Sequence, residues 1–163
     1  MKLKFLKLPA FTLIELLIVI AIVGIMAAAV ILAINPAKRS GQARDAIRKS
    51  DIAVLADAFQ AYYVAHGGLY PGYPGFPSAF PAFCGSWAFD ELVTSGELKV
   101  VPNDPQDPTN QYCVKIKLNP PKSEAAIFVM LEEPTNLNLV FYCWNSRTNT
   151  LFETNGNTCV QGI

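Results

Sequence analysis

Residues 11–34 read FTLIELLIVIAIVGIMAAAVILAI, and this stretch decides the fold of the chain. From Leu16 to Ile34 it contains no charged residue. At about 1.5 Å per residue, a helix of this length crosses a hydrocarbon layer of about 30 Å. A cleaved secretory signal usually has a shorter apolar core of about 7–15 residues. We therefore expect residues 11–35 to form one transmembrane helix.

The triplet Ala27-Ala28-Ala29 satisfies a different signal, a signal-peptidase site of the A-x-A kind. Four apolar residues, Val30 to Ala33, follow it directly, so the apolar stretch does not end there. Release of a secreted soluble enzyme after Ala29 is therefore the lesser alternative.

Glu15 places a carboxylate near the start of the apolar stretch. A charge at the edge of an apolar helix is costly, and this cost predicts a functional partner for it. The alternative is that Glu15 only lies at the level of the lipid headgroups.

The string KLPAFTLIELL, residues 7–17, closely resembles the class III signal of type IV pilins and pseudopilins. The resemblance implies that prepilin peptidase removes residues 1–10 as a leader by cutting between Ala10 and Phe11, and that Phe11 is then N-methylated. It also implies that Glu15 pairs with the new terminal amine of a neighbouring subunit during assembly. The family usually has Gly before the cut, where this chain has Ala10, whereas Phe11 to Glu15 match residue for residue.

The chemistry of the segment agrees with this implication. Cleavage removes the three cations of the leader and creates an ammonium group beside an apolar helix, which Glu15 of another copy would neutralise in a bundle of low dielectric. Small residues at helical spacing favour close packing of helices, and an ordinary lipid-facing anchor is the alternative. The small residues are Ala21, Gly24, Ala27 and Ala28.

The helical pattern continues beyond the span after an interruption. Asn35-Pro36 breaks it, because proline lacks an amide donor and crowds the preceding turn, so we expect a helix kink at Pro36. Residues 36–66 then form the second half of the long helix, which Gly67-Gly68 ends. Apolar residues recur on one face at intervals of three to four: Ile52, Leu55, Phe59, Tyr62 or Tyr63, and His66.

The charges form blocks, although the formal net charge is zero. Between Lys38 and Asp51 five cations outweigh two carboxylates, and from Ile52 onward ten carboxylates outweigh five cations. We interpret the basic run as a solvated helix face, and nucleic acid is a disfavoured partner because Asp45 and Asp51 interrupt the run. In a filament, the acidic distal domain of one copy would also suit the basic stem of another.

Residues 67–109 are rich in Pro and Gly and predict a loop region with one short helix, Ser86–Ser95, ended by Gly96. Asp104 and Asp107 lie in its turn-rich part, where their oxygens suit calcium. Because Asp-Pro is an ordinary turn pair, calcium is only a weak candidate, and we expect no other cofactor or metal.

Residues 110–163 predict an antiparallel sheet with a C-terminal hairpin around Asn155-Gly156. Runs rich in Val, Ile, Phe and Tyr predict the strands Gln111–Leu118, Ala126–Glu132 and Leu137–Trp144, and the hairpin would add Asn149–Glu153 and Thr158–Val160. The expected fold class is α+β: a long kinked amino-terminal helix, membrane-spanning in its first half, packed under a carboxyl-terminal antiparallel sheet.

All four cysteines lie in the distal half, and none is at C-x-x-C spacing: Cys84, Cys113, Cys143 and Cys159. An even count in an exported domain predicts two disulfides, with three connectivities open. Cys143–Cys159 is the favoured bond because its cysteines flank the hairpin region, and Cys84–Cys113 follows by elimination.

The sequence therefore predicts a structural subunit of a type IV pilus-like filament and not an enzyme. No nucleophile–base pairing, cluster of metal ligands or Gly-rich phosphate loop stands out, and the sole histidine, His66, suits a structural role. Expected partners are copies of the chain, prepilin peptidase, the pilus or secretion assembly machinery and the inner membrane.

We expect a single-pass protein of the cytoplasmic membrane with its carboxyl-terminal domain outside, which then joins a cell-surface or periplasmic filament. A pseudopilin of a type II secretion or DNA-uptake system is the alternative within the family. A single-span, membrane-anchored binding domain that does not polymerise is the alternative outside it.

Overall fold

The structure is a computed structural model that describes residues 11–72, 82–116, 124–156 and 159. The expected leader, the proline-rich part from 73 to 81, the end of the strand expected up to Leu118 and most of Thr158–Val160 lie outside these residues. The chain divides into an amino-terminal unit that ends at Arg39 and a carboxyl-terminal unit that begins at Ser40.

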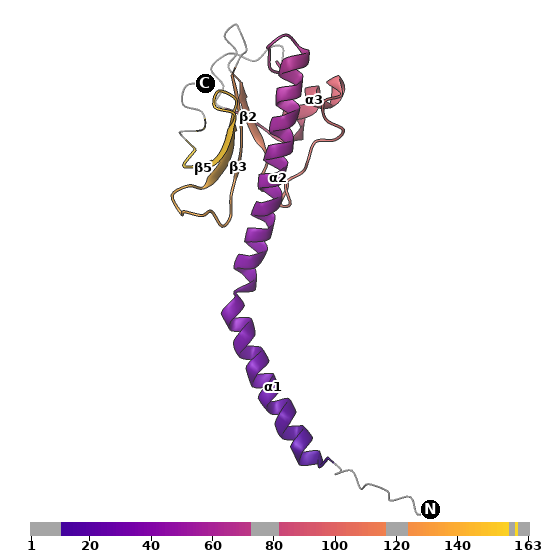
Figure 1. The fold of residues 1–163 in the computed structure, drawn as a ribbon, viewed down its shortest axis with the longest axis vertical. Coiled ribbons are helices and arrows are strands. Elements are labelled where there is room, and N and C mark those ends of the chain that lie inside the picture. Colours follow the sequence, from indigo (N-terminus) through magenta and orange to yellow (C-terminus); the bar gives the residue numbers. More distant parts are fainter. Residues whose placement is uncertain (1–10, 73–81, 117–123, 157–158, 160–163) are drawn as a thin grey trace, which may run out of the picture. The chain divides into compact units, whose positions relative to one another are not determined.

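Helix α1, Leu13–Ile34, makes up most of the amino-terminal unit, and helix α2, Pro36–Ala65, follows it (Figure 1). Asn35 between them is left-handed, with φ of 47°, and ends α1. Its side-chain oxygen accepts a hydrogen bond from the Lys38 backbone N–H at 3.3 Å and thereby caps α2. Pro36 is the first residue of α2, where its missing N–H costs nothing. The interruption is therefore a boundary between two capped helices, instead of a proline inside one.

The carboxyl-terminal unit is built on one face of α2. Ile52, Leu55, Phe59 and Tyr62 are buried there, which confirms the apolar face expected from their spacing. His66 differs, because it is exposed and stacks on the Tyr62 ring with 3.7 Å between centroids. The helix ends in a Schellman motif, in which the Gly68 N–H donates to the Tyr63 carbonyl at 2.9 Å.

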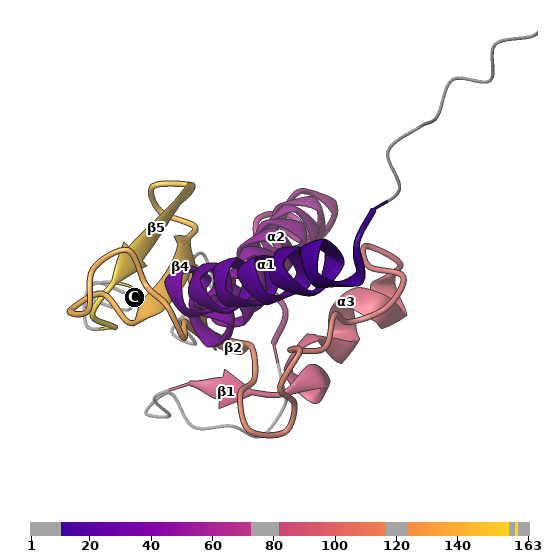
Figure 2. The ribbon, with the colours of Figure 1, turned by 90° about the horizontal axis from the view of Figure 1, so that it is seen from below.

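Five strands form one antiparallel sheet in sequence order: β1 (Phe83–Cys84), β2 (Cys113–Ile116), β3 (Ala125–Met130), β4 (Phe141–Asn145) and β5 (Thr150–Thr154). A 3₁₀ turn, Ser86–Phe89, and helix α3, Asp90–Ser95, follow β1. Seen along α2, the sheet and α3 lie around the helix (Figure 2). The expected α+β class is confirmed.

The strand register gives the sheet two different faces. Val114, Ile127 and Trp144 are aligned across β2, β3 and β4 and belong to the core shared with α2. In the next row across the strands, Cys113, Phe128 and Cys143 are aligned on the opposite face. Residues of the disulfides therefore lie on the side of the sheet that faces away from α2.

One strand prediction needs correction. Leu137 and Asn138 form a turn and not the start of β4, because the Asn136 side chain accepts from the Asn138 N–H at 3.0 Å and its carbonyl accepts from the Leu139 N–H at 2.8 Å. Val140 already bonds to the chain after β3, because its carbonyl accepts from the Leu131 N–H at 2.8 Å. A hairpin joins β4 to β5, and the two-residue strand β1 was not predicted. The second strand of the hairpin expected around Asn155-Gly156 lies mostly outside the described residues.

Candidate functional site

The start of α1 is closed by a reciprocal pair of hydrogen bonds between Thr12 and Glu15. The Thr12 hydroxyl accepts from the Glu15 N–H at 3.3 Å, and the Glu15 carboxylate accepts from the Thr12 N–H at 2.9 Å. This is a capping box, in which the first and fourth residues satisfy two backbone donors that the helix leaves free. The spacing Thr-x-x-Glu is the sequence signal that predicts this cap.

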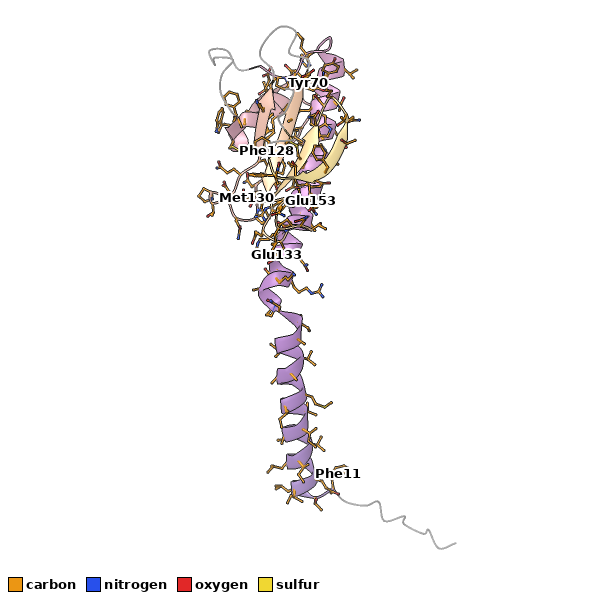
Figure 3. All side chains as sticks on the ribbon, turned by 90° about the vertical axis from the view of Figure 1, so that its left-hand side faces the viewer. Phe11, Tyr70, Phe128, Met130, Glu133 and Glu153 are labelled. Atoms are coloured by element: carbon orange, nitrogen blue, oxygen red, sulfur yellow. A yellow bond between two sulfur atoms is a disulfide. The ribbon has the colours of Figure 1, made fainter. Side chains whose placement is uncertain are left out.

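Apart from Glu15 in its first turn, helix α1 is apolar around its whole circumference. A 19-residue part, Leu13–Ile31, is long and apolar enough to cross a membrane. Its described side chains project from the ribbon and are exposed, and Phe11 at its start is 80% exposed (Figure 3). Gly24 has open space where a Cβ would lie. An apolar helix of this kind needs lipid or other helices to cover it.

Comparison with known families agrees with this geometry. Residues 10–31 match the family described as the prokaryotic N-terminal methylation motif. This match spans the expected junction of Ala10 and Phe11, the capping box and most of α1. The chain carries the class III signal of type IV pilins and pseudopilins. No curated protein and no solved structure matches the chain.

The motif supports a type IV pilin-like substrate of prepilin peptidase, and it implies processing by that peptidase and a pilus-type assembly machinery. Together with the apolar helix it indicates anchoring in a membrane, with a folded carboxyl-terminal unit attached. This pilin-like assignment also favours a structural protein over an enzyme.

A buried ionic cluster lies in the carboxyl-terminal unit, where the sequence had suggested a solvated helix face. Arg48 is fully buried on α2, and Asp45 is 3% exposed. The Arg48 Nε and Nη2 donate to the two Asp104 oxygens at 2.6 and 2.9 Å. Its Nη1 donates to Asp45 at 2.8 Å and to Glu132 at 2.6 Å. These charge-assisted bonds, first of all those to Asp104, raise the pKa of Arg48 further above its usual value.

Glu132 connects this cluster to a second cation. The Arg44 Nε and Nη2 donate to its two oxygens at 2.8 and 2.5 Å. The bonds from Arg44, and then those from Arg48, lower the pKa of Glu132 to about 2. The Asp45 carboxylate accepts from the Glu132 and Glu133 backbone N–H groups, so α2 is also bonded to the chain after β3.

Three of the five cations of the basic run, Arg44, Arg48 and Lys49, therefore find countercharges inside the same chain. Lys49 follows the pattern of the two arginines, with its Nζ 2.7 Å from a Glu153 oxygen. The interpretation as a solvated face is wrong for Arg48 and Asp45, which are buried. The i,i+3 spacing of these two residues was a usable signal, but Asp104 lies 56 residues away and could not be paired with Arg48 from sequence.

The weak calcium candidates are not brought together as a site. Both Asp104 oxygens accept from Arg48, whereas Asp107 is exposed and accepts from the Gln111 amide at 3.2 Å. Within the described ranges, no group of three or more His, Cys, Asp or Glu residues could hold a metal ion. Asp104 serves as the anchor for Arg48.

The cysteines form two disulfides, Cys84–Cys113 and Cys143–Cys159. This connectivity agrees with the expected one. Cys84 and Cys113 are direct partners in the register of β1 and β2, so the bond fixes the edge strand of the sheet. Cys143 and Cys159 form a small buried cluster with Ala126, on the face of the sheet away from α2.

Proposed function

We propose that the chain is a structural subunit of a type IV pilus-like filament. Prepilin peptidase cleaves between Ala10 and Phe11, Phe11 is N-methylated, and the subunit then assembles from the membrane. The observation that carries the proposal is the position of Glu15, at the capped start of a helix that is otherwise apolar.

The charge of Glu15 has a defined task in this scheme. Cleavage creates an ammonium group on Phe11, which enters an apolar bundle when α1 packs against the helices of other copies. Desolvating that group without a countercharge costs several kcal/mol, and the Glu15 carboxylate of a neighbour supplies one. In the described subunit both bonds from Thr12 end on the Glu15 Oε2, so Oε1 can accept from the neighbour's amine while the cap is kept.

The carboxyl-terminal unit is placed outside the cytoplasm in this proposal. Two disulfides support an oxidising compartment. The internal pairing of Arg44, Arg48 and Lys49 supports assembly as well, because stems with paired cations repel one another less when many copies are brought together.

A matched pair of variants separates the charge of Glu15 from its capping role. Glu15→Gln removes the charge but can still cap, because glutamine serves at the fourth position of a capping box. Thr12→Ala removes the capping hydroxyl, worth about 1 kcal/mol, and keeps the charge. We expect Glu15→Gln to insert and mature normally but to lose filaments, and Thr12→Ala to keep them.

Filament yield by electron microscopy and shearing gives the readout, with a blot for equal mature protein. Loss of the Glu15 countercharge costs about 3–5 kcal/mol at every subunit. Because every subunit repeats this cost, filament assembly becomes unfavourable. Normal filaments from Glu15→Gln would contradict the proposal and favour a membrane-anchored domain that does not polymerise. If only Thr12→Ala loses filaments, then assembly requires the helix cap and not the charge of Glu15.

A further inference from the structure

Two cations of the basic run differ from the other three. Arg44, Arg48 and Lys49 are paired with carboxylates of the carboxyl-terminal unit. The side chains of Lys38 and Arg39, here called the exposed pair, are open to solvent and form no hydrogen bond or ion pair with any residue that the structure describes. The exposed pair therefore carries charge that a partner outside the chain can neutralise.

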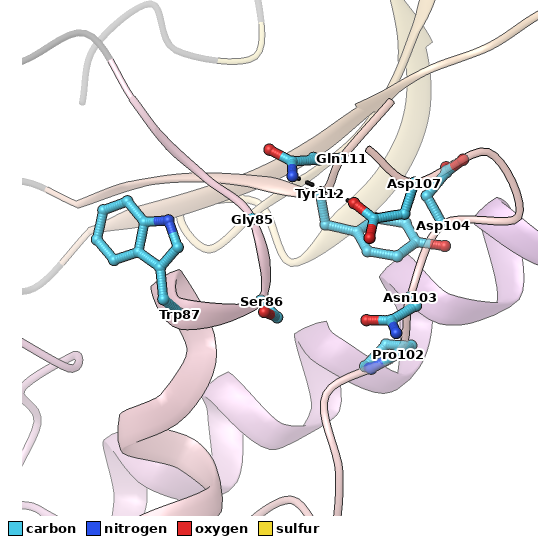
Figure 4. Close-up of a pocket in the computed structure, with 9 residues that line it drawn as sticks. All are labelled: Gly85, Ser86, Trp87, Pro102, Asn103, Asp104, Asp107, Gln111 and Tyr112. Carbon is cyan, nitrogen blue, oxygen red and sulfur yellow. Dashed lines mark hydrogen bonds between the residues drawn. The ribbon is translucent and has the colours of Figure 1, made fainter. Parts of the chain in front are cut away.

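The carboxyl-terminal unit uses its own acidic groups internally, including those at its polar pocket (Figure 4). Both oxygens of Asp104 accept from buried Arg48, at 2.6 and 2.9 Å. Asp107 on the same pocket accepts from the Gln111 amide at 3.2 Å. These carboxylates are therefore not available to the exposed pair.

The exposed pair follows the apolar helix by a fixed, short distance. Helix α1 has 22 residues, which measure about 33 Å at about 1.5 Å per residue, and it ends at Ile34. Lys38 comes four residues later, which corresponds to about 6 Å of helix. The amino-terminal unit, which ends at Arg39, contains both α1 and the exposed pair.

This distance matches the layered structure of a membrane. The headgroup layer on each side of the hydrocarbon is about 5–7 Å thick. Long Lys and Arg side chains extend their charged ends towards such a layer while their stems lie along apolar surface. When α1 spans a membrane, the exposed pair therefore lies at the level of the lipid headgroups.

The chemistry of the exposed pair fits the phosphate of a lipid. An Arg guanidinium binds phosphate through two parallel N–H donors, and a Lys ammonium adds a compact charge beside it. Helix α1 has no cation in its last turn, so the exposed pair is the first positive charge after the span. Nucleic acid is disfavoured, because its binding depends on many phosphate contacts and the other three cations of the run are already paired.

We propose that Lys38 and Arg39 bind the phosphate of an anionic phospholipid at the boundary of the span. The bound lipid then holds this end of α1 at the headgroup level. The proposal rests on α1 spanning a membrane, and it holds whether or not the chain later joins a filament.

NMR of the arginine side chains tests the proposal on the full chain. The protein, with isotopically labelled arginine, is placed in nanodiscs of phosphatidylcholine with a rising share of phosphatidylglycerol in both leaflets. Residues 1–10 contain no arginine and add no signal. We expect the Arg39 Nε–H signal, assigned by its loss in Arg39→Gln, to shift as phosphatidylglycerol increases. The Arg48 signal is the internal control and should stay in place, because its Nε–H donates to Asp104 inside the core.

A matched pair of variants tests whether the two cations act together. One cation near an anionic surface strengthens binding about fivefold. Lys38→Gln should therefore raise the share of phosphatidylglycerol that gives half of the Arg39 shift by about fivefold. Lys99→Gln makes the same change of charge at an exposed position of the carboxyl-terminal unit and should leave this share unchanged.

Several outcomes would overturn the proposal. An Arg39 signal that ignores phosphatidylglycerol would do so, as would equal half-shift values for Lys38→Gln and Lys99→Gln. An equally large shift from sodium phosphate in discs of phosphatidylcholine alone would identify a site for free anions. A shift that appears only when more chains share a disc would identify a second copy as the partner, and either result would overturn lipid binding.

Discussion

Arg48 carries a positive charge into the core of the carboxyl-terminal unit, where Asp45 and Asp104 neutralise it. Arg48→Met fills similar space but leaves two buried carboxylates without their cation. We expect it to lower the free energy of unfolding by about 3–5 kcal/mol. Lys49→Met is the control, because its pair with Glu153 is partly exposed and is worth less than about 1 kcal/mol.

Denaturant unfolding of the purified full chain, followed by near-UV circular dichroism, measures both variants. The Arg48 variant should shift the midpoint several times further than the Lys49 variant. Equal shifts would show that the buried pair contributes no more than an exposed one.

Glu132 makes the same cluster sensitive to acid. Its pKa falls from 4.5 to about 2 in the folded protein, chiefly through the bonds from Arg44. A carboxylate with a lowered folded-state pKa stabilises the fold fully above the unfolded value of 4.5, and this contribution is lost as the pH falls towards 2. We expect Glu132→Gln to be less stable at neutral pH and to lose less on acidification. Thermal melting of both proteins across this window measures the difference, and parallel curves would contradict the assignment.

At the scale of elements, the sequence predicted those features that depend on residues close together along the chain. The recurrence of Ile52, Leu55 and Phe59 identified the buried face of α2, because residues three and four apart share a side of a helix. Local reasoning failed at Leu137 and Asn138, where a run rich in strand-forming residues suggested a strand but Asn136 forms a local turn. The turn chemistry of the asparagines outweighed the composition of the run.

The sheet depends on covalent bonds as well as on packing. The two disulfides close segments with separations of 16 and 29 residues. By loop entropy each contributes about 3 kcal/mol, the longer one slightly more. We expect two double variants to lower the free energy of unfolding by similar amounts. They are Cys143→Ala with Cys159→Ala, and Cys84→Ala with Cys113→Ala. Chemical denaturation without reductant measures both, and non-reducing peptide maps that show a Cys113–Cys143 bond would contradict the connectivity.

At the scale of the whole molecule, the two kinds of site differ in how far the sequence could reveal them. Thr12 and Glu15 are close in sequence, so their motif and its membrane context could be recognised directly. Arg48 meets Asp104 across 56 residues, and Glu132 joins the same cluster from 84 residues away. Such arrangements depend on the tertiary fold, and spacing along the chain carries no signal for them.

The central claim is that the mature chain begins at Phe11 and is built into a filament. Mass spectrometry of the amino-terminal peptide, taken from sheared filaments and from the membrane fraction of the same cells, tests it most directly. We expect both fractions to contain the chain with N-methylated Phe11 at its start. A chain that begins at Met1 or Val30, or a mature chain that is absent from every filament preparation, would contradict the account.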